Sequence, residues 1–183
     1  RVLCIRITYL GELGYELYVP AEQAVHVYDR LVAAGPEFGL RHAGTKALAS
    51  LRMEKAYRDY GHDIDNTDDV LEAGLGFAVD LTKDDFIGKA AVVAKKEAPL
   101  SKRLVQVQVL DKDAMLFHGE VVWRDGKAVG YVRAGSYGHT LGGAVGLAMV
   151  ADSGRPVTPS WVNEGAWTVD IAGREYPARA SLK

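Results

Sequence analysis

The sequence predicts an α+β fold over residues 1–100, followed by a small all-β barrel or sandwich over residues 101–183. Three observations support this division. A β-rich stretch opens the chain, segments with apolar residues at helical spacing follow it, and short alternating segments begin after Pro99 and Ser101. Short, evenly spaced strands indicate a small barrel or sandwich.

The bulk composition is that of an ordinary globular protein, with 48% hydrophobic and 25% charged residues in 183. A formal net charge of −2 provides no basic surface for nucleic acid, and no apolar run approaches a membrane span. We therefore expect neither a nucleic-acid partner nor a membrane partner. Cys4 is the single cysteine, so an internal disulfide is excluded, and we expect Cys4 to be a small core residue. Because the chain opens with Arg1-Val2-Leu3 in strand-like sequence, we expect a fragment.

The opening stretch, from Ile5 to Val19, reads as a strand, a turn and a strand. Glycines at 11 and 14 are expected to supply the positive φ of a tight reversal. In the second strand Glu16 and Tyr18 face one way, and their neighbours face the other way. Glu16 is unusual, because a carboxylate among large apolar groups needs a partner if it is buried. Two interpretations stay open, an exposed edge-strand glutamate and a ligand-binding carboxylate.

The rest of residues 1–100 is predicted to be mainly helical. Apolar spacing predicts helices over 21–34, 44–56 and 89–97, and glycines within an apolar run predict a strand over 73–80. Acidic residues between the last two helices suggest calcium, but an EF-hand loop starting at Asp63 would have Asp68 and Gly74 where Gly and Glu are required. We therefore interpret this acidic cluster as turn and capping chemistry. Its members are Asp63, Asp65, Asp68, Asp69 and Glu72.

Six short strands are predicted after residue 100, over 103–110, 119–124, 127–134, 144–150, 166–171 and 175–178. Asp125-Gly126 and Ala172-Gly173 provide turns between neighbouring strands. Trp161 and Trp167 are expected to fill the barrel core. His139 lies in a glycine-rich loop without a visible catalytic partner, so a structural loop residue is favoured over an acid or base.

Two motifs carry a resemblance to a known family. Residues 9–16 resemble the Tyr-Thr-Gly-Glu-x-Gly-Tyr-Glu signature of the glycine-cleavage T-protein (aminomethyltransferase) family, with Leu10 in place of Thr. Leu51-Arg52-Met53-Glu54 resembles that family's Leu-Arg-Leu-Glu, although Leu48 replaces an Arg that the T-protein associates with folate. Residues 54–65 look more like the C-terminal regions of sarcosine and dimethylglycine dehydrogenases.

The resemblance implies a partial aminomethyltransferase-like (ferredoxin-like) α+β domain and a C-terminal β-barrel. It also implies tetrahydrofolate binding, with Glu16 holding the pterin and Tyr9 walling its site. A carboxylate suits the pterin edge, which presents a ring N–H beside an amino group. For Arg52 two roles stay open, serving folate or pairing with a carboxylate such as Glu54 or Asp63.

By the same resemblance, the parent protein is an FAD-dependent sarcosine or dimethylglycine dehydrogenase that oxidises a small N-methyl amine. Its flavin region, and a folate-domain stretch carrying a catalytic aspartate, lie outside the sequence given, so no catalytic residue is assigned here. Such a protein is expected in the bacterial cytoplasm or the mitochondrial matrix. The alternatives are a non-catalytic regulatory or scaffold relative and a stand-alone aminomethyltransferase.

Overall fold

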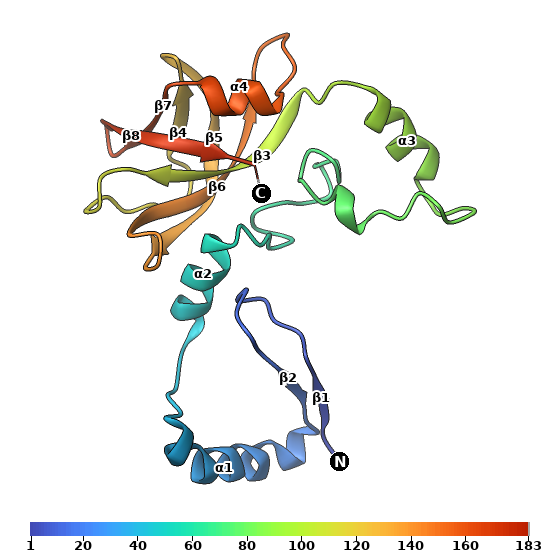
Figure 1. The fold of residues 1–183 in the computed structure, drawn as a ribbon, viewed down its shortest axis with the longest axis vertical. Helices are drawn as coiled ribbons and strands as arrows, with labels where there is room; N and C mark the ends of the chain where they lie inside the picture. The colour runs from blue at the N-terminus through green and yellow to red at the C-terminus, as the bar shows by residue number, and fades with distance from the viewer. Residues whose placement is uncertain (183) are drawn as a thin grey trace.

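The structure is a computed structural model that describes residues 1–182, with a small α+β portion below and beside a six-stranded barrel (Figure 1). Its α+β portion begins with a two-stranded antiparallel hairpin, joins it to α2 through α1, and ends with α3. The hairpin, α1 and α2 lie along three sides of an open frame in Figure 1. The elements are β1 (Leu3–Ile5), β2 (Glu16–Tyr18), η1 (Ala21–Gln23), α1 (Ala24–Ala34), η2 (Gly35–Phe38), α2 (Thr45–Glu54), η3 (Gly76–Ala78) and α3 (Lys89–Glu97).

The hairpin pairs Cys4 with Leu17 and Ile5 with Glu16, and a broad reversal over 6–15 connects its strands. The predicted order of strand, turn and strand is therefore right, but the tight turn is wrong. Gly11 has the expected left-handed φ of 74°, whereas Gly14 does not. A Cβ on Gly14 would lie 3.2 Å from Thr8 Cβ, so close approach inside the reversal is what favours glycine there.

The barrel is closed and entirely antiparallel, with strand order β3-β6-β5-β4-β7-β8. Each of the six predicted strands is present, which confirms the barrel prediction. Both predicted two-residue turns are confirmed as well, because Asp125 and Gly126 have φ of 51° and 75°, and Ala172 and Gly173 have φ of 54° and 82°. The strands are β3 (Lys102–Val109), β4 (Val121–Arg124), β5 (Lys127–Gly138), β6 (Gly143–Ala151), β7 (Trp167–Ile171) and β8 (Arg174–Ser181).

Strand β6 explains how the two parts of the molecule are joined. Its residues Gly143–Val150 are all buried, because one face points into the barrel and the other is covered by the α+β portion. Ala144, Ala148 and Val150 belong to the barrel core. Val145, Leu147 and Met149 of the same strand pack with the end of α2 and the turns after it, in a second cluster. That cluster comprises Met53, Ala56, Ile64, Ala73, Leu104, Val145, Leu147 and Met149.

Several sequence predictions are corrected by the fold. Residues 73–80 form a turn containing η3 rather than a strand, and Cys4 is exposed rather than in the core, because β1 pairs with β2 alone. Trp167 is buried in the barrel, and Trp161 packs at its edge. Helix α4 (Pro159–Glu164) was not predicted, although Thr158 and Pro159 form a capping sequence, in which the Thr158 hydroxyl accepts from Trp161 N at 3.1 Å.

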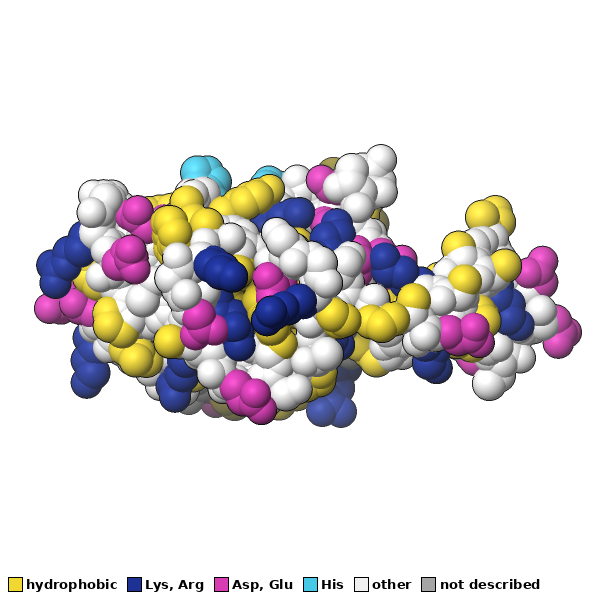
Figure 2. All heavy atoms as spheres, turned by 90° about the horizontal axis from the view of Figure 1, so that it is seen from above, with side chains coloured by type: hydrophobic (Ala, Val, Ile, Leu, Met, Phe, Trp, Pro, Cys, Tyr) yellow, Lys and Arg dark blue, Asp and Glu magenta, His cyan; other side chains and the backbone are white. Residues whose placement is uncertain are grey.

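The α+β portion exposes many large hydrophobic side chains. Figure 2 shows such side chains on the lobe that corresponds to the α3 segment projecting at the right of Figure 1. Exposed examples from the hairpin to α3 are Leu3, Ile7, Leu13, Tyr15, Val25, Phe38, Phe77 and Ile87.

None of the helices within residues 1–182 has the length and apolar character needed to cross a bilayer.

Candidate functional site

The tip of the 6–15 reversal is anchored on the C-terminal end of α2 and the segment after it. Tyr9 donates its hydroxyl hydrogen bond to the carbonyl of Arg58 at 2.9 Å, and its ring stacks on Tyr57 with 6.3 Å between centroids. Burial raises the pKa of the Tyr9 phenol above its ordinary value. The side chain of Lys55 covers Gly11, so a Cβ there would lie 2.2 Å from Lys55 Cγ. The reversal is thus held by contacts from Lys55 and the residues that follow α2.

Arg52 lies under this anchored tip, with its guanidinium carbon 5.8 Å from the centroid of the Tyr9 ring. It donates to both carboxylate oxygens of Asp63, and Nη1 also donates to the Tyr57 carbonyl at 2.8 Å. Both side chains of this ion pair are buried, at 9% and 0% exposure. The structural role considered for Arg52 is therefore observed, with Asp63 as the partner. A role towards folate stays a prediction.

Glu16 directly follows the reversal, at the start of β2, and is exposed. Its Oε2 accepts a 2.7 Å hydrogen bond from the Tyr18 hydroxyl, as expected for residues two apart on one strand face. The structure therefore brings Tyr9 and Arg52 together, whereas Glu16 makes no hydrogen bond or ion pair with either within residues 1–182. Its assignment to the pterin stays a prediction.

A mainly apolar cavity of about 360 Å³ opens between the tip of the reversal and α2 with the two residues before it. Leu10 lines it from the reversal, and Leu48 and Leu51 line it from α2. Leu10 and Leu48 are two of the positions at which this sequence departs from the T-protein motifs, and both place an apolar side chain at this cavity. Its other lining residues are Ala43, Gly44, Thr45 and Ala47.

Helix α2 is fixed to the barrel by hydrogen bonds of three side chains that sequence reasoning missed. Ser50 donates to the Tyr137 carbonyl at 2.6 Å, and buried Gln106 donates to the Met53 carbonyl at 2.7 Å. Glu54 Oε1 accepts from the backbone N–H groups of Thr140 and Leu141 at 2.7 and 3.0 Å. Because one carboxylate binds two successive N–H groups, the glycine-rich loop of the barrel is held against α2.

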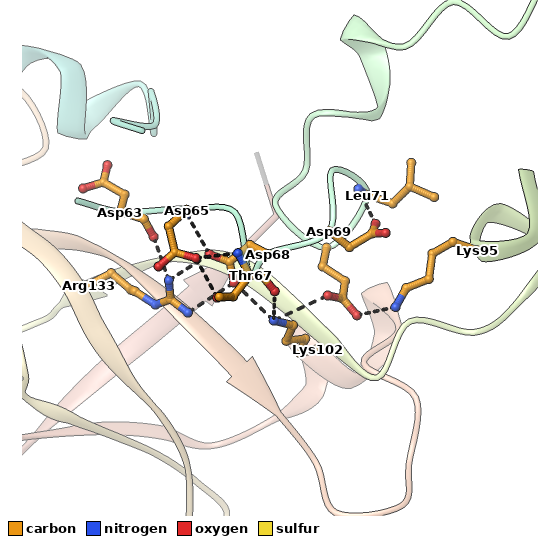
Figure 3. Close-up of polar contacts among 10 residues, drawn as sticks. Asp63, Asp65, Thr67, Asp68, Asp69, Leu71, Lys95, Lys102 and Arg133 are labelled. Carbon is orange, nitrogen blue, oxygen red and sulfur yellow. Dashed lines mark hydrogen bonds and ion pairs between the residues drawn. The ribbon is translucent and has the colours of Figure 1, made fainter. Parts of the chain in front are cut away.

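Two members of the acidic cluster, Asp68 and Glu72, form an ion-pair network that joins the α+β portion to the barrel (Figure 3). Asp68 binds Arg133 at 2.9 Å and Lys102 at 3.2 Å, and Glu72 binds Lys95 at 2.8 Å. The carboxylates of Asp68 and Glu72 are almost completely buried, at 1% and 3% exposure.

The turn chemistry predicted for this cluster is present only in part. Asp65 accepts from the Thr67 backbone N–H, and Asp69 accepts from that of Leu71, whereas Asp68 and Glu72 serve as ion-pair partners. Within the described part of the chain, 1–182, no three acidic, histidine or cysteine side chains converge as a metal site would require.

The ion pairs of Asp68 predict a pH-dependent stability. Burial raises the pKa of Asp68, but hydrogen bonds from Arg133, the Asp65 backbone N–H and Lys102 lower it by more, so the pKa is below its ordinary value of 3.8. A lowered pKa in the folded state stabilises the fold above the unfolded pKa, and this contribution is lost as the pH falls through the folded pKa. The stability difference between wild type and Asp68→Asn should therefore shrink below about pH 4.

Urea titrations of both proteins from pH 7 to pH 3 measure this difference. Asp113→Asn, at an exposed position outside the network, is the matched control. A wild-type minus Asp68→Asn difference that is constant over this range would contradict the assignment.

Comparison with known proteins decides the family. Residues 1–83 match the family model of the GCVT N-terminal domain, and residues 102–183 match that of the glycine cleavage T-protein C-terminal barrel domain. The chain belongs to the glycine cleavage T-protein family. The aminomethyltransferase T of Bartonella henselae shares this T-protein fold, with a TM-score of 0.82 at 23% identity over 97% of this chain and 48% of that one.

Curated relatives of this T-protein family member include both enzymes and a regulatory protein. It is 43% identical to 4-methylaminobutanoate oxidase (formaldehyde-forming) of Paenarthrobacter nicotinovorans, over 98% of this chain and 21% of the relative. It is 38% identical to mitochondrial sarcosine dehydrogenase of Homo sapiens, over 100% of this chain and 20% of the relative. It is 37% identical to the mitochondrial pyruvate dehydrogenase phosphatase regulatory subunit of Mus musculus, over 96% of this chain and 21% of the relative. The chain therefore spans about a fifth of the length of these relatives.

Proposed function

We propose that this chain is the C-terminal tetrahydrofolate-binding portion of an FAD-dependent sarcosine or dimethylglycine dehydrogenase. The observation that carries the proposal is the similarity to sarcosine dehydrogenase along the whole chain, including the segment with Tyr9 and Glu16. The proposal includes the division into a folate-binding domain, 1–100, and a C-terminal barrel domain, 101–183. Since two of these relatives are named as mitochondrial, a eukaryotic parent would be placed in the mitochondrial matrix.

The chemistry of Glu16 and Tyr9 supports a pterin ligand. Glu16 offers an exposed carboxylate whose Oε1 has no partner within residues 1–182, and such a group accepts two parallel N–H donors from a planar heterocycle. Tyr9 is held by Arg58 and Tyr57, so its ring can wall a site without rearrangement. When bound, tetrahydrofolate would supply the nitrogens that take up the one-carbon unit as 5,10-methylenetetrahydrofolate.

The chain's own contribution under this proposal is positioning. Arg52 supports Tyr9 from beneath while its charge is balanced by Asp63. The flavin oxidation of the small N-methyl amine belongs to the proposed parent. Exposed apolar side chains on β1, β2 and α1 support the idea that further protein covers this portion of the fold.

Glu16→Gln in the full-length protein tests the proposal. The substitution replaces one acceptor with a donor that faces the ligand's own donors, so we expect tetrahydrofolate affinity to fall at least about tenfold. Isothermal titration calorimetry measures this change. Glu12→Gln is the matched control, because Glu12 is exposed in the same reversal and, among residues 1–182, its one ion pair is with Lys55, at 4.0 Å. An unchanged affinity in Glu16→Gln would refute the role of Glu16.

The regulatory relative favours a second candidate, a non-catalytic subunit with the same fold. Oxidation of sarcosine and dimethylglycine by the full-length, flavin-loaded protein separates the two. Turnover of either amine supports the dehydrogenase. A folded protein that turns over neither amine but binds a partner protein without flavin supports the regulatory subunit.

A further inference from the structure

We propose that Tyr18 is a positioning residue that fixes the Glu16 carboxylate for ligand binding, so that the binding unit of the hairpin is a tyrosine–glutamate pair. This inference rests on the proposed function, because it assigns the ligand to Glu16. Tyr18 is the group that orients the carboxylate, and it lies outside the family motifs of residues 9–16 and 51–54.

The geometry of β2 brings the pair together. Glu16 and Tyr18 are two residues apart on one strand, so their side chains leave the same face. Their backbones are held by the ladder, in which Glu16 pairs with Ile5 and Tyr18 pairs with Leu3. The Tyr18 hydroxyl donates to Glu16 Oε2 at 2.7 Å, an ordinary length for a charge-assisted O–H···O bond.

This bond leaves the carboxylate able to bind a ligand. A carboxylate has about four acceptor positions, two on each oxygen, and Tyr18 occupies one of those on Oε2. One position on Oε2 and both on Oε1 remain for a planar edge that carries two neighbouring N–H groups. A ligand with that edge would receive a carboxylate already held in place.

The benefit is preorganisation. An exposed glutamate samples many rotamers, and fixing it on binding costs conformational free energy. A tyrosine side chain has only two rotatable torsions, so it is a stiff arm for holding the carboxylate. A tyrosine hydroxyl is a donor at neutral pH, and the hydrogen bond to Glu16, followed by the charge of Glu16, raises the pKa of the Tyr18 phenol above its ordinary value.

The test measures tetrahydrofolate affinity of the full-length protein by calorimetry in four variants. Tyr18→Phe keeps the ring and removes the donor, and we expect about three- to tenfold weaker binding. In a Glu16→Ala background the same substitution should have no further effect, because Tyr18 acts through Glu16. Tyr15→Phe is the matched control, since Tyr15 precedes β2, is exposed, and makes no hydrogen bond through its hydroxyl in the described residues 1–182. The tetrahydrofolate affinity of Tyr15→Phe should equal that of wild type.

An ultraviolet pH titration supplies a readout that a merely structural role would not move. The absorbance change that is absent in Tyr18→Phe belongs to the Tyr18 phenol. This phenol should ionise at lower pH in Glu16→Ala than in wild type, because Glu16 raises its pKa. Full affinity in Glu16→Ala would overturn the proposed function and this inference together. If Glu16→Ala loses affinity but Tyr18→Phe binds normally, or weakens binding equally in the Ala background, the inference fails and the proposed function stands.

Discussion

Asp63→Ala is expected to lower the free energy of unfolding by about 3–5 kcal/mol, because it leaves the buried guanidinium of Arg52 without its counter-ion. Asp63 is fully buried, and its Oδ2 also accepts from the Asp59 backbone N–H at 3.0 Å. Removing the carboxylate therefore leaves a cation and a backbone donor without this partner. Chemical denaturation of this chain, followed by far-ultraviolet circular dichroism, measures the loss.

The double variant Arg52→Met/Asp63→Leu separates a lost ion pair from lost packing. Two apolar groups of similar size remove both charges, so most of the stability should return. Asp85→Ala, at an exposed position, should leave the transition unchanged. If Asp63→Ala were as stable as wild type, the Arg52–Asp63 pair would not be a buried, stabilising contact. Because Arg52 lies beneath Tyr9, a loosened tip of the reversal should accompany the loss.

Gly130→Ala is expected to destabilise the barrel by about 3 kcal/mol, since the added methyl has no room. Gly130 lies in β5 opposite Val150 of β6, and its Cβ would lie 2.1 Å from the backbone carbonyl oxygen of Met149. A backbone atom in a paired strand cannot rotate away as a side chain can, so the strands must separate locally.

Thermal and urea denaturation of Gly130→Ala measure this cost. The control is Gly44→Ala at the N-cap of α2, where φ is −109° and a Cβ would meet no atom within 4 Å. That substitution should change stability by no more than about 1 kcal/mol. Equal stability of the two variants would contradict the close approach of β5 and β6.

The barrel could be predicted from the sequence because its signals are local. Alternating side chains mark a strand within a few residues, and Asp125-Gly126 marks a hairpin whose backbone requires positive φ. Helices α1, α2 and α3 were found for the same reason, since apolar spacing repeats within each segment. Residues 73–80 misled this reasoning, because the apolar side chain of Ala73 packs from a turn into the second hydrophobic cluster.

The candidate site was predictable only in part. The sequence placed Glu16 and Tyr18 on one strand face, and their hydrogen bond agrees with this alternation. For Arg52 the sequence left two roles open. The contact with Asp63 forms only because the backbone between residues 52 and 63 turns back on itself, which the sequence pattern did not predict. Sequence reasoning missed the partners of Asp68, because Lys102 and Arg133 lie 34 and 65 residues further along the chain. The apolar run of β6 was the available signal that both faces of that strand are covered.

By itself, then, the sequence determined helices α1 to α3, the six barrel strands, two of the turns between them and the family motif, because each depends on residues close together in the chain. The tertiary structure alone decided which charges are paired, which glycines lie against another strand, and that α2 connects the reversal to the barrel. These properties depend on distances between segments far apart in the sequence, and burial in the folded protein sets their energies.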